Sequence, residues 1–528
     1  MDMKSSSQTA APAPPPPPPT PTPAPAPAPA PAPFVSLVAD PRRRVVVFVL
    51  LLTALFMATL DNQIVSTALP TIVGEFGQLE RFGWIGSAYL LTSSAVMPLY
   101  GKLGDLFGRK YVIMAAVAIF TLGSLVCGLA TSMDTLIAAR VLQALGGGGI
   151  MVSIFSINAD LFEARERARY QSYSSLALMA SGAIGPVLGG TLSDLFGWRS
   201  IFLVNLPIGI LVLAGLAFLL PYRKPHRRPK IDYAGAILLA GAVASVVLWA
   251  DSAQIFGSLI ATQSLAVIAF GLVCALGWIA VERRVAEPVV PLSLFSNRTI
   301  NLMLIVSLVS GAIGIGSVNY VALFLQTTTG LSPTHAGLLF IAMTGGIAAG
   351  SLWAGRRISK SGLYKPFSVA STALGVVSLA FFSQMHAGTS VVLIAAVMLL
   401  HGISIGIGQQ VPVLGVQNAA ARDDVGAATG TVTLARMSGA AIAISIYGAI
   451  IGSGLSHLTN QIPGVADFQQ LTPQMLAALP EASRAAVAEA YAGAFFPLFL
   501  TASGIVAIGL VSALMLKNVR LPVAGKGR

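Results

Sequence analysis

Asp61 is the residue of this chain whose type and position most directly indicate chemistry. It follows segment 45–60, which contains no charged residue and only two polar ones, both threonines. A carboxylate inside a bilayer is costly unless it has a partner, water or a proton, so an acid at such a position indicates a functional site. The other acids fall in predicted loops, in tails or at helix ends. We predict that Asp61 binds a proton or a substrate cation, with a purely structural ion pair as the alternative.

Arg140 is the cation expected to pair or compete with Asp61, and a structural pair with helix carbonyls is the alternative. At ~1.5 Å per helical residue, Asp61 lies roughly 25 Å beyond Arg44, and Arg140 comes shortly after the outer end of its own segment. Both side chains are therefore expected in the outer half of the membrane. Burial favours the neutral form of a carboxyl group, whereas a nearby guanidinium favours its ionised form. A carboxylate held between these influences is suited to bind and release a proton.

Several other polar side chains interrupt apolar segments and are candidates to line an internal cavity. They are Asn62, Asn319, Gln326, His401, Gln409, Gln410 and Arg436. For His401, a packed and hydrogen-bonded histidine is favoured over a proton relay. Arg436 has no carboxylate at its depth, which leaves open whether it binds backbone carbonyls or faces a cavity. The five histidines are dispersed and the two cysteines lie in separate segments, so the sequence predicts no catalytic set, metal site or cofactor.

The composition is that of an integral membrane protein. Hydrophobic residues make up 55% of the chain and charged residues 10%, with a mean hydropathy of +0.79, whereas soluble domains carry about 25% charged residues. Apolar stretches of about 20 residues predict membrane-spanning helices, because barrel strands are nearer 10 residues with alternating polarity. The formal net charge of +12 does not indicate nucleic-acid binding, since the cations gather in alternate short loops.

Fourteen apolar segments are predicted to span the membrane. They lie near 45–68, 83–101, 111–131, 135–160, 170–192, 201–220, 233–250, 261–281, 300–325, 335–355, 366–385, 390–413, 425–452 and 494–516. Arginine and lysine are concentrated on one side of these segments, which is the cytoplasmic side by the positive-inside rule. The pattern predicts a multi-pass protein of the plasma (inner) membrane with both termini in the cytoplasm.

The segments group into two halves with an insertion. Residues 1–40 are a proline/alanine-rich tail that is expected to be disordered. Residues 41–222 form six spans, 223–284 two inserted spans, and 285–518 six more with an external loop at 453–493, before a short tail at 519–528. Gly101 and Gly108 recur as Gly355 and Gly362 with the same spacing in basic loops. Repeated halves around a central site are typical of secondary transporters.

The basic loop after the second segment contains the most specific motif. Its residues are Gly101, Asp105, Gly108, Arg109 and Lys110. Glycine permits the positive φ of a tight turn, and Asp105 can accept hydrogen bonds from free amides at a helix end. This loop resembles the signature loop of the major facilitator superfamily, where it acts at the cytoplasmic gate.

Three further segments strengthen this resemblance. The segment from Arg140 to Gly146 is similar to the family's arginine-containing motif, which is associated with proton coupling. Gly182, Gly185, Pro186 and Gly189 are similar to the motif of the antiporter members. The Asp61 segment, together with 198–209, resembles the fourteen-helix drug:proton antiporter branch. The resemblance covers about residues 45–516.

The resemblance implies an all-α, polytopic antiporter that exports lipophilic small molecules or drugs by alternating access. It is expected to be driven by the proton gradient without a cofactor and to act as a monomer, and the need for a periplasmic adaptor stays open. Segments 300–413 contain no acid, which argues against divalent organic cations as substrates. A dedicated exporter of one metabolite, siderophore or lipid is the alternative. A membrane enzyme or a non-transporting membrane sensor is disfavoured.

Overall fold

The computed structural model describes residues 35–76, 82–224, 232–250, 252, 256–285, 287–329, 333–386, 388–456 and 480–522. Over these residues the predicted all-α class is confirmed, with one isolated antiparallel bridge between Leu363 and Arg520. The first half contains α1 (Pro41–Phe76), α2 (Phe82–Phe107), α3 (Arg109–Gly128), α4 (Met133–Leu161), α5 (Ala164–Phe196), α6 (Ser200–Leu203) and α7 (Asn205–Leu219).

The remaining helices follow in chain order. The inserted pair is α8 (Tyr233–Ala250) and α10 (Thr262–Glu282). The second half contains η2 (Leu292–Ser296), α11 (Arg298–Gly311), η3 (Ala312–Ser317), α12 (Val318–Thr327), α13 (Pro333–Ser361), α14 (Lys365–Ser383), α15 (Val391–Gly408), α16 (Val411–Ala419), η4 (Arg422–Asp424), α17 (Val425–Ser456) and α19 (Glu481–Met515). Three predicted spans are therefore interrupted: 201–220 between α6 and α7, 300–325 by the π-helix η3, and 390–413 between α15 and α16.

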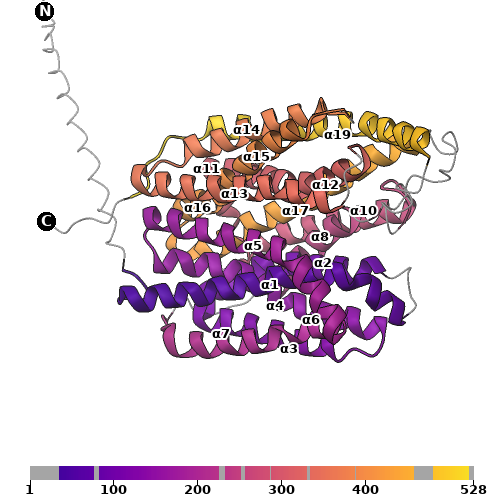
Figure 1. Ribbon diagram of the computed structural model, residues 1–528. Helices are drawn as coiled ribbons and strands as arrows, with labels where there is room; N and C mark the ends of the chain where they lie inside the picture. Colours follow the sequence, from indigo (N-terminus) through magenta and orange to yellow (C-terminus); the bar gives the residue numbers. More distant parts are fainter. Residues whose placement is uncertain are drawn as a thin grey trace, which may run out of the picture.

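The two halves lie against each other as two layers of roughly parallel rods (Figure 1). Helices α1 to α7 form the lower layer in that view and α11 to α19 the upper layer. Across the boundary, α2 packs on α17 and α5 packs on α13. Glycines allow close approach within a layer as well: a Cβ on Gly146 of α4 would meet the Phe120 amide nitrogen of α3 at 2.4 Å.

Twelve helices in the described ranges are long and apolar enough to cross a membrane, or thirteen when the two parts of the bent α5 count as one span. They establish a multi-pass helical membrane protein. Helix α2 occupies the predicted span 83–101 but is not among them, and it carries several serines, a threonine and two tyrosines. Fourteen spans and two repeated halves stay predictions.

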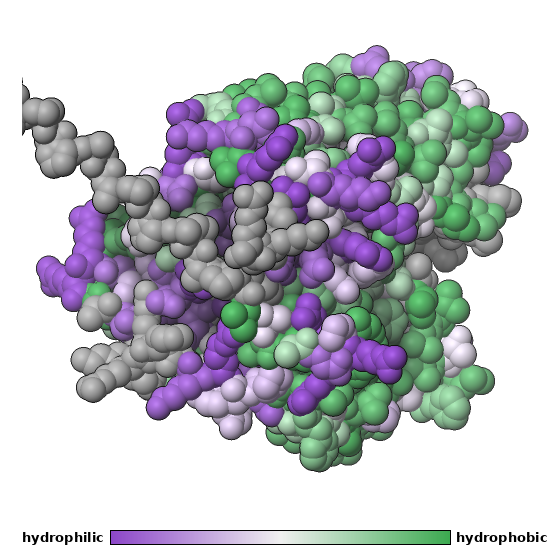
Figure 2. All heavy atoms as spheres, turned by 90° about the vertical axis from the view of Figure 1, so that its left-hand side faces the viewer, coloured by the Kyte–Doolittle hydropathy of each residue, from purple (hydrophilic) through white to green (hydrophobic). Residues whose placement is uncertain are grey.

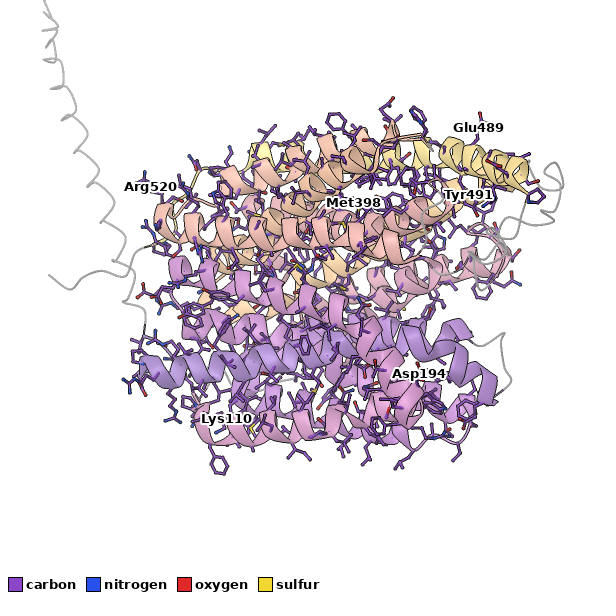
Figure 3. The ribbon with its side chains drawn as sticks, in the orientation of Figure 1. Lys110, Asp194, Met398, Glu489, Tyr491 and Arg520 are labelled. Atoms are coloured by element: carbon purple, nitrogen blue, oxygen red, sulfur yellow. The ribbon has the colours of Figure 1, made fainter. Side chains whose placement is uncertain are left out.

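Charge separates the two ends of the bundle. Lys110 and Arg520 lie at one end, which we call the basic end, and Asp194 and Glu489 lie toward the opposite end (Figure 3). Figure 2 looks onto the basic end and shows hydrophilic residues gathered there between hydrophobic flanks. The external loop predicted at 453–493 is shorter than expected, because α17 continues to Ser456 and α19 begins at Glu481. Residues 457–479 lie outside the described ranges.

The predicted tail at 1–40 is wrong at its end, because residues from Val35 onward pack on the first half. The side chain of Val38 is 3% exposed and belongs to the hydrophobic cluster of that half. The Leu37 amide donates to the Asp160 carbonyl at 2.9 Å, and Ser36 Oγ donates to the Leu161 carbonyl at 2.8 Å. This short segment covers the basic end of α4. Residues 1–34 lie outside the described ranges.

This correction gives two deletions with different expected results. Removing residues 2–34 should leave the melting temperature of the purified protein unchanged, since a proline/alanine tract has little apolar surface to bury. Removing residues 2–38 should lower it, because burial of Val38 is lost, which is worth about 1.5–3 kcal/mol. Thermal unfolding of the two proteins in one detergent, followed by size-exclusion chromatography, measures the difference. Equal melting temperatures would show that the contacts of 35–38 are immaterial.

Candidate functional site

Asp61 lies in α1 with a fully buried side chain, among polar side chains from three other helices. Its Oδ2 atom forms an ion pair with Nη1 of Arg140 in α4. Its Oδ1 atom accepts hydrogen bonds of 2.8 Å from Nε2 of Gln143 in α4 and from Nδ2 of Asn205 in α7. Both amides also donate to Ser124 Oγ of α3, at 2.7 Å and 3.3 Å. Four helices thus meet at one carboxylate.

Arg140 is fully buried as well and is held from several directions. Besides its ion pair, Nη1 donates to Gln143 Oε1 at 2.7 Å, Nη2 to Asn62 Oδ1 at 3.2 Å, and Nε to the Ile85 carbonyl at 3.4 Å. Its Cζ atom lies 4.3 Å from the centre of the Tyr89 ring. The ring and the carbonyl connect the guanidinium to α2, so Asp61 and α2 share one cation.

The arrangement around Asp61 suits an ionised carboxylate, because each of these contacts comes from a donor. Binding a proton would remove the negative charge from the ion pair and add a donor that needs an acceptor. Oδ1 of Asn205 is buried and has no hydrogen-bond partner. Half a turn of the Asn205 amide would present this oxygen to a protonated Asp61. The same half-turn would move Nδ2 away from Asp61 and Ser124 and into the unpaired position that Oδ1 now holds.

The glycines of α5 bring α1 close at the residue two positions after Asp61. Helix α5 bends by 45° between its parts Ala164–Gly182 and Val187–Phe196. A Cβ on Gly185 would meet Gln63 Cβ at 2.4 Å, and one on Gly182 would lie 3.4 Å from Gln63 Nε2. Gly189 is buried in the same helix. The side chain of Pro186 lies outside the described part of the structure. The bend thus falls beside the Asp61 segment.

At the basic end, Asp105 joins the two halves. Its Oδ1 and Oδ2 atoms accept hydrogen bonds from the amides of Gly426 and Ala427, at 3.1 Å and 3.0 Å. These are free amides at the first turn of α17, where a carboxylate is favoured. Arg109 Nη2 donates to Asp105 Oδ1 at 3.1 Å, and Arg109 Nε pairs with Asp160 Oδ2 at 2.8 Å. The loop is therefore tied to both α4 and α17.

The Asp105 contact depends on close backbone approach. A Cβ on Gly101 would meet the Gly426 carbonyl oxygen at 2.3 Å, which leaves no room for a side chain between α2 and α17. Gly108 has φ of +90° and begins α3, and a Cβ there would meet the Tyr222 ring at 2.7 Å. Lys110 Nζ donates to the Ala217 carbonyl at 2.7 Å, near the end of α7.

The matching loop after α13 makes a comparable contact with the first half. A Cβ on Gly355 would meet Ser172 Oγ of α5 at 2.7 Å, and Gly362 has φ of +71°. Ser351 Oγ donates to the Ser172 carbonyl at 3.4 Å. The first glycine of each loop therefore packs on a helix of the other half.

Burial raises the pKa of Asp105 from 3.8 to about 7, against the opposing effects of Arg109 and the Ala427 amide. Asp160 and Asp424 also raise it, because their negative charges lie nearby.

The opposite end of α1 is fixed by an exposed carboxylate. Glu75 accepts hydrogen bonds from Trp198 Nε1 at 2.7 Å and from Arg199 Nη2 at 2.8 Å. These bonds to Arg199 and Trp198 lower the pKa of Glu75. Arg199 Nη2 also donates to the Ala130 carbonyl at 3.0 Å. The tryptophan–arginine pair that belongs to the family resemblance thus holds α1 to the segment between α5 and α7.

The remaining candidates of the second half separate into two groups. His401 is buried, with Nε2 3.0 Å from Ser317 Oγ and Nδ1 2.8 Å from Ser378 Oγ, which is the packed and hydrogen-bonded arrangement. Arg436 Nη1 donates to the Gln409 carbonyl at 3.3 Å, at the break between α15 and α16, where Gln410 also lies. The side chains of Asn319 and Gln326 lie outside the described part of the structure.

Gln143, Asn205 and Ser124 were not predicted as site residues, although they contact the Asp61 network. Gln143 and Asn205 stand in segments that carry the family resemblance, and Ser124 is a polar residue inside the apolar segment 111–131. The sequence signal for these residues is an uncharged polar side chain within an apolar segment. This signal is weak, because a serine in a helix often hydrogen-bonds only to the backbone of its own helix.

Comparisons with known proteins agree with the fold. Residues 51–444 match the sequence model of the Major Facilitator Superfamily. An uncharacterized MFS-type transporter of Mycobacterium tuberculosis is 33% identical over 494 residues, which cover 91% of this chain and 71% of that protein. Multidrug resistance protein 3 of Bacillus subtilis is 30% identical over 411 residues, covering 76% and 78% of the two chains.

Two solved structures share the architecture. The human organic anion transporter MFSD10 (TETRAN) superposes with a TM-score of 0.61 at 17% identity, covering 90% of this chain and 100% of that one. The proton:xylose symporter XylE gives a TM-score of 0.59 at 14% identity, covering 90% and 95%. At these identities the likeness concerns the fold.

Proposed function

This chain belongs to the major facilitator superfamily, and we propose that it is a proton-coupled antiporter of the fourteen-helix drug-exporting branch. It is a multi-pass membrane transporter, as its family and its relatives named multidrug transporters and efflux pumps indicate. Its substrates would be lipophilic small molecules, which leave the cell as protons enter. The proton gradient would supply the driving force.

The observation that carries this proposal is the buried Asp61 among donors. A fully buried carboxylate that pairs with Arg140 and accepts from Gln143 and Asn205 is an ionisable group with its ionised form satisfied. An acid inside a membrane bundle is a functional site by default. Proton binding there releases Arg140 from its ion pair and frees it to change partners, through Tyr89 and the Ile85 carbonyl of α2.

Release of Arg140 would couple to the movement of the two halves through α2. The same helix holds Asp105 and Gly101 at the basic end, where they contact α17. A shift of α2 upon protonation of Asp61 would therefore reach the contact between halves. In the structure α2 and α17 are in contact there. With the basic end in the cytoplasm, as proposed, this would be a transporter closed on its cytoplasmic side.

The test of the proposal is transport in proteoliposomes. With an imposed pH gradient, the purified protein should accumulate a fluorescent lipophilic substrate such as ethidium and should carry protons in the opposite direction. The proton flux must depend on the substrate and must collapse with a protonophore. Accumulation that persists without any proton gradient would contradict proton coupling.

The pH dependence of the contact at the basic end can be predicted from Asp105. Its pKa is about 7 when α2 and α17 are in contact and about 3.9 when the group is solvated. The closed arrangement thus binds the additional proton, so its stabilisation is complete below pH ~4 and is lost as the pH rises through ~7. Asp105→Asn should remove this pH dependence, because asparagine does not titrate. It should also slow transport, because an asparagine side chain has one acceptor oxygen and cannot accept both amide bonds.

Spin labels at exposed Tyr222, at the end of the first half, and exposed Val519, just after the second half, report the separation. In the unsubstituted protein the long-distance fraction should grow as the pH rises from about 5 to 8. The native cysteines are buried and should label little. A pH response that survives in Asp105→Asn would assign the titration to another group.

The proposed orientation places the basic end in the cytoplasm. Glu489 and Arg520 are both exposed and lie at opposite ends. Cysteine at Glu489 should react with an impermeant thiol reagent on intact cells, and cysteine at Arg520 only after permeabilisation. The reverse pattern would invert the topology.

A further inference from the structure

Arg436 is a cation inside the bundle that faces the other half. It lies about 17 Å along α17 from Val425, roughly a third of the way along that 32-residue helix, at ~1.5 Å per residue. Its side chain is 5% exposed. Its Cζ atom lies 6.0 Å from the ring centre of Phe155 in α4. The guanidinium is thus placed where the two halves meet, the position at which secondary transporters bind their substrates.

The described contacts leave the charge of Arg436 uncompensated. Within the described ranges, one of its five N–H donors makes a hydrogen bond, from Nη1 to the neutral Gln409 carbonyl at 3.3 Å. No ion pair of Arg436 occurs within the described ranges. A buried charge without a counter-charge is costly, and partnering with an opposite charge is the usual remedy.

Within the described ranges, acids are scarce on the helices of the second half. Helices α11 to α17 carry acids only in η4, as Asp423 and Asp424 at the basic end. Glu489 of α19 lies toward the opposite end of the bundle. Asp61 already pairs with Arg140. An anionic group on a bound molecule would compensate Arg436.

Two glutamines at the break between α15 and α16, where the Gln409 carbonyl accepts from Arg436, have side-chain atoms without partners. Gln410 is 8% exposed, and both its Nε2 and its Oε1 atoms are buried without a hydrogen bond. It borders a cavity of about 20 Å³ that Gln171 of the first half lines as well. Oε1 of Gln409 is likewise buried and unpaired. Unpaired buried amides are rare in native proteins and call for an explanation such as a ligand or water.

The surroundings of these polar groups are apolar. Phe155 belongs to one hydrophobic cluster with Val411, Leu414 and Val432, from α4, α16 and α17. A molecule that places an anionic group on Arg436 would therefore lay its remaining surface against hydrophobic side chains. This combination selects a lipophilic anion rather than an inorganic one.

We propose that Arg436, with the side-chain amides of Gln409 and Gln410, binds the carboxylate of lipophilic anionic or zwitterionic substrates. The inference rests on the proposed export function. Guanidinium and carboxylate groups form two parallel charge-assisted hydrogen bonds, and the unpaired Gln410 Nε2 atom at the adjoining helix break would be a further donor. The site would distinguish a carboxylic acid from its uncharged ester.

Equilibrium binding of a matched pair of probes tests the assignment. Norfloxacin and its methyl ester differ only in the carboxylate, and both are fluorescent. Binding is measured on the full-length protein in lipid nanodiscs, without a pH gradient. The acid should bind more tightly than the ester. Arg436→Gln should weaken the acid at least ~10-fold, which is a loss of about 1.4 kcal/mol, and leave the ester unchanged.

Further variants keep the test decisive. Arg436→Lys should retain part of the preference for the acid, because it keeps the charge but not the fork of donors. Gln410→Leu should weaken the acid less than Arg436→Gln and provides a second test should that variant fail to fold. Arg356→Gln, on the exposed face of α13, is the matched control and should bind both probes normally.

Three outcomes would overturn the proposal. They are equal binding of acid and ester by the unsubstituted protein, an equal loss of both in Arg436→Gln, and a preference that disappears when chloride replaces gluconate, which would assign the site to an inorganic anion. Because no gradient is used, a failure of proton coupling leaves this result unaffected, so the two proposals fail separately.

Discussion

Replacing Asp61 with asparagine should abolish proton-driven export while the protein still inserts into the membrane. Asparagine keeps the size of the side chain and one acceptor for Arg140, but it cannot gain or lose a proton. Ethidium accumulation in proteoliposomes under an imposed pH gradient should fall to the level of empty liposomes. Asp61→Glu should retain partial activity with a displaced pH profile, because the titrating group survives in altered geometry.

The control for Asp61→Asn addresses the guanidinium that it leaves behind. Removing one partner of a buried ion pair costs about 3–5 kcal/mol, so loss of activity could follow from loss of structure. The double variant Asp61→Asn/Arg140→Gln replaces the pair with two neutral amides and should recover the melting temperature. It should stay uncoupled. Gradient-driven accumulation by either variant would place the coupling carboxylate elsewhere or exclude protons as the coupled ion.

Gly101→Ala should prevent normal closure of the basic end. The new Cβ would lie 2.3 Å from the Gly426 carbonyl oxygen, whereas a C···O contact needs about 3.3 Å. Helices α2 and α17 must then separate by ~1 Å. Overpacking of this kind costs about 1–3 kcal/mol, which shifts the closed-to-open ratio by ~5- to 150-fold. Transport should fall correspondingly, and cysteines near the contact should become accessible from the basic side.

Gly104→Ala is the matched control on the same helix. A Cβ at Gly104 would meet only Arg109 Cγ, at an ordinary 3.7 Å. Both substitutions improve helix propensity by a similar amount, ~1 kcal/mol, so a difference between them reports the contact with α17. Equal transport by the two variants would show that closure does not require the approach of Gly101 to Gly426.

The sequence by itself determined the class of the protein and the identity of its main charged residues. Apolar segments of membrane-spanning length predict helices, because only internally hydrogen-bonded segments are stable in a bilayer. Asp61 and Arg140 were recognisable as isolated charges in apolar segments. A charge in such a segment is costly to bury and therefore indicates a functional site. The tight turn predicted for the loop from Gly101 to Lys110 is confirmed only at Gly108, which has positive φ, because α2 continues through Gly101 and Asp105 to Phe107.

Boundaries and partners depended on the tertiary structure. Hydropathy does not predict that a helix extends beyond its apolar segment, as α19 does by beginning at Glu481. It also does not predict that a short segment such as 35–38 packs on the helices of the first half. It also assigns no partner to a neutral polar residue. Gln143 and Asn205 contact Asp61 because α4 and α7 cross α1 at that level, and the Gln409 carbonyl is free to accept from Arg436 because the helix breaks there.

The physical reason is the range of the interactions. The free energy of burying a charge or an apolar side chain depends on the type of that residue, so it can be read from the local sequence. The hydrogen bonds that offset it join residues 79, 82 and 144 positions apart at Asp61, and 321 positions apart between Asp105 and Gly426. Which residues meet across such separations is decided by helix packing, in which single glycines such as Gly101 and Gly185 set the distance.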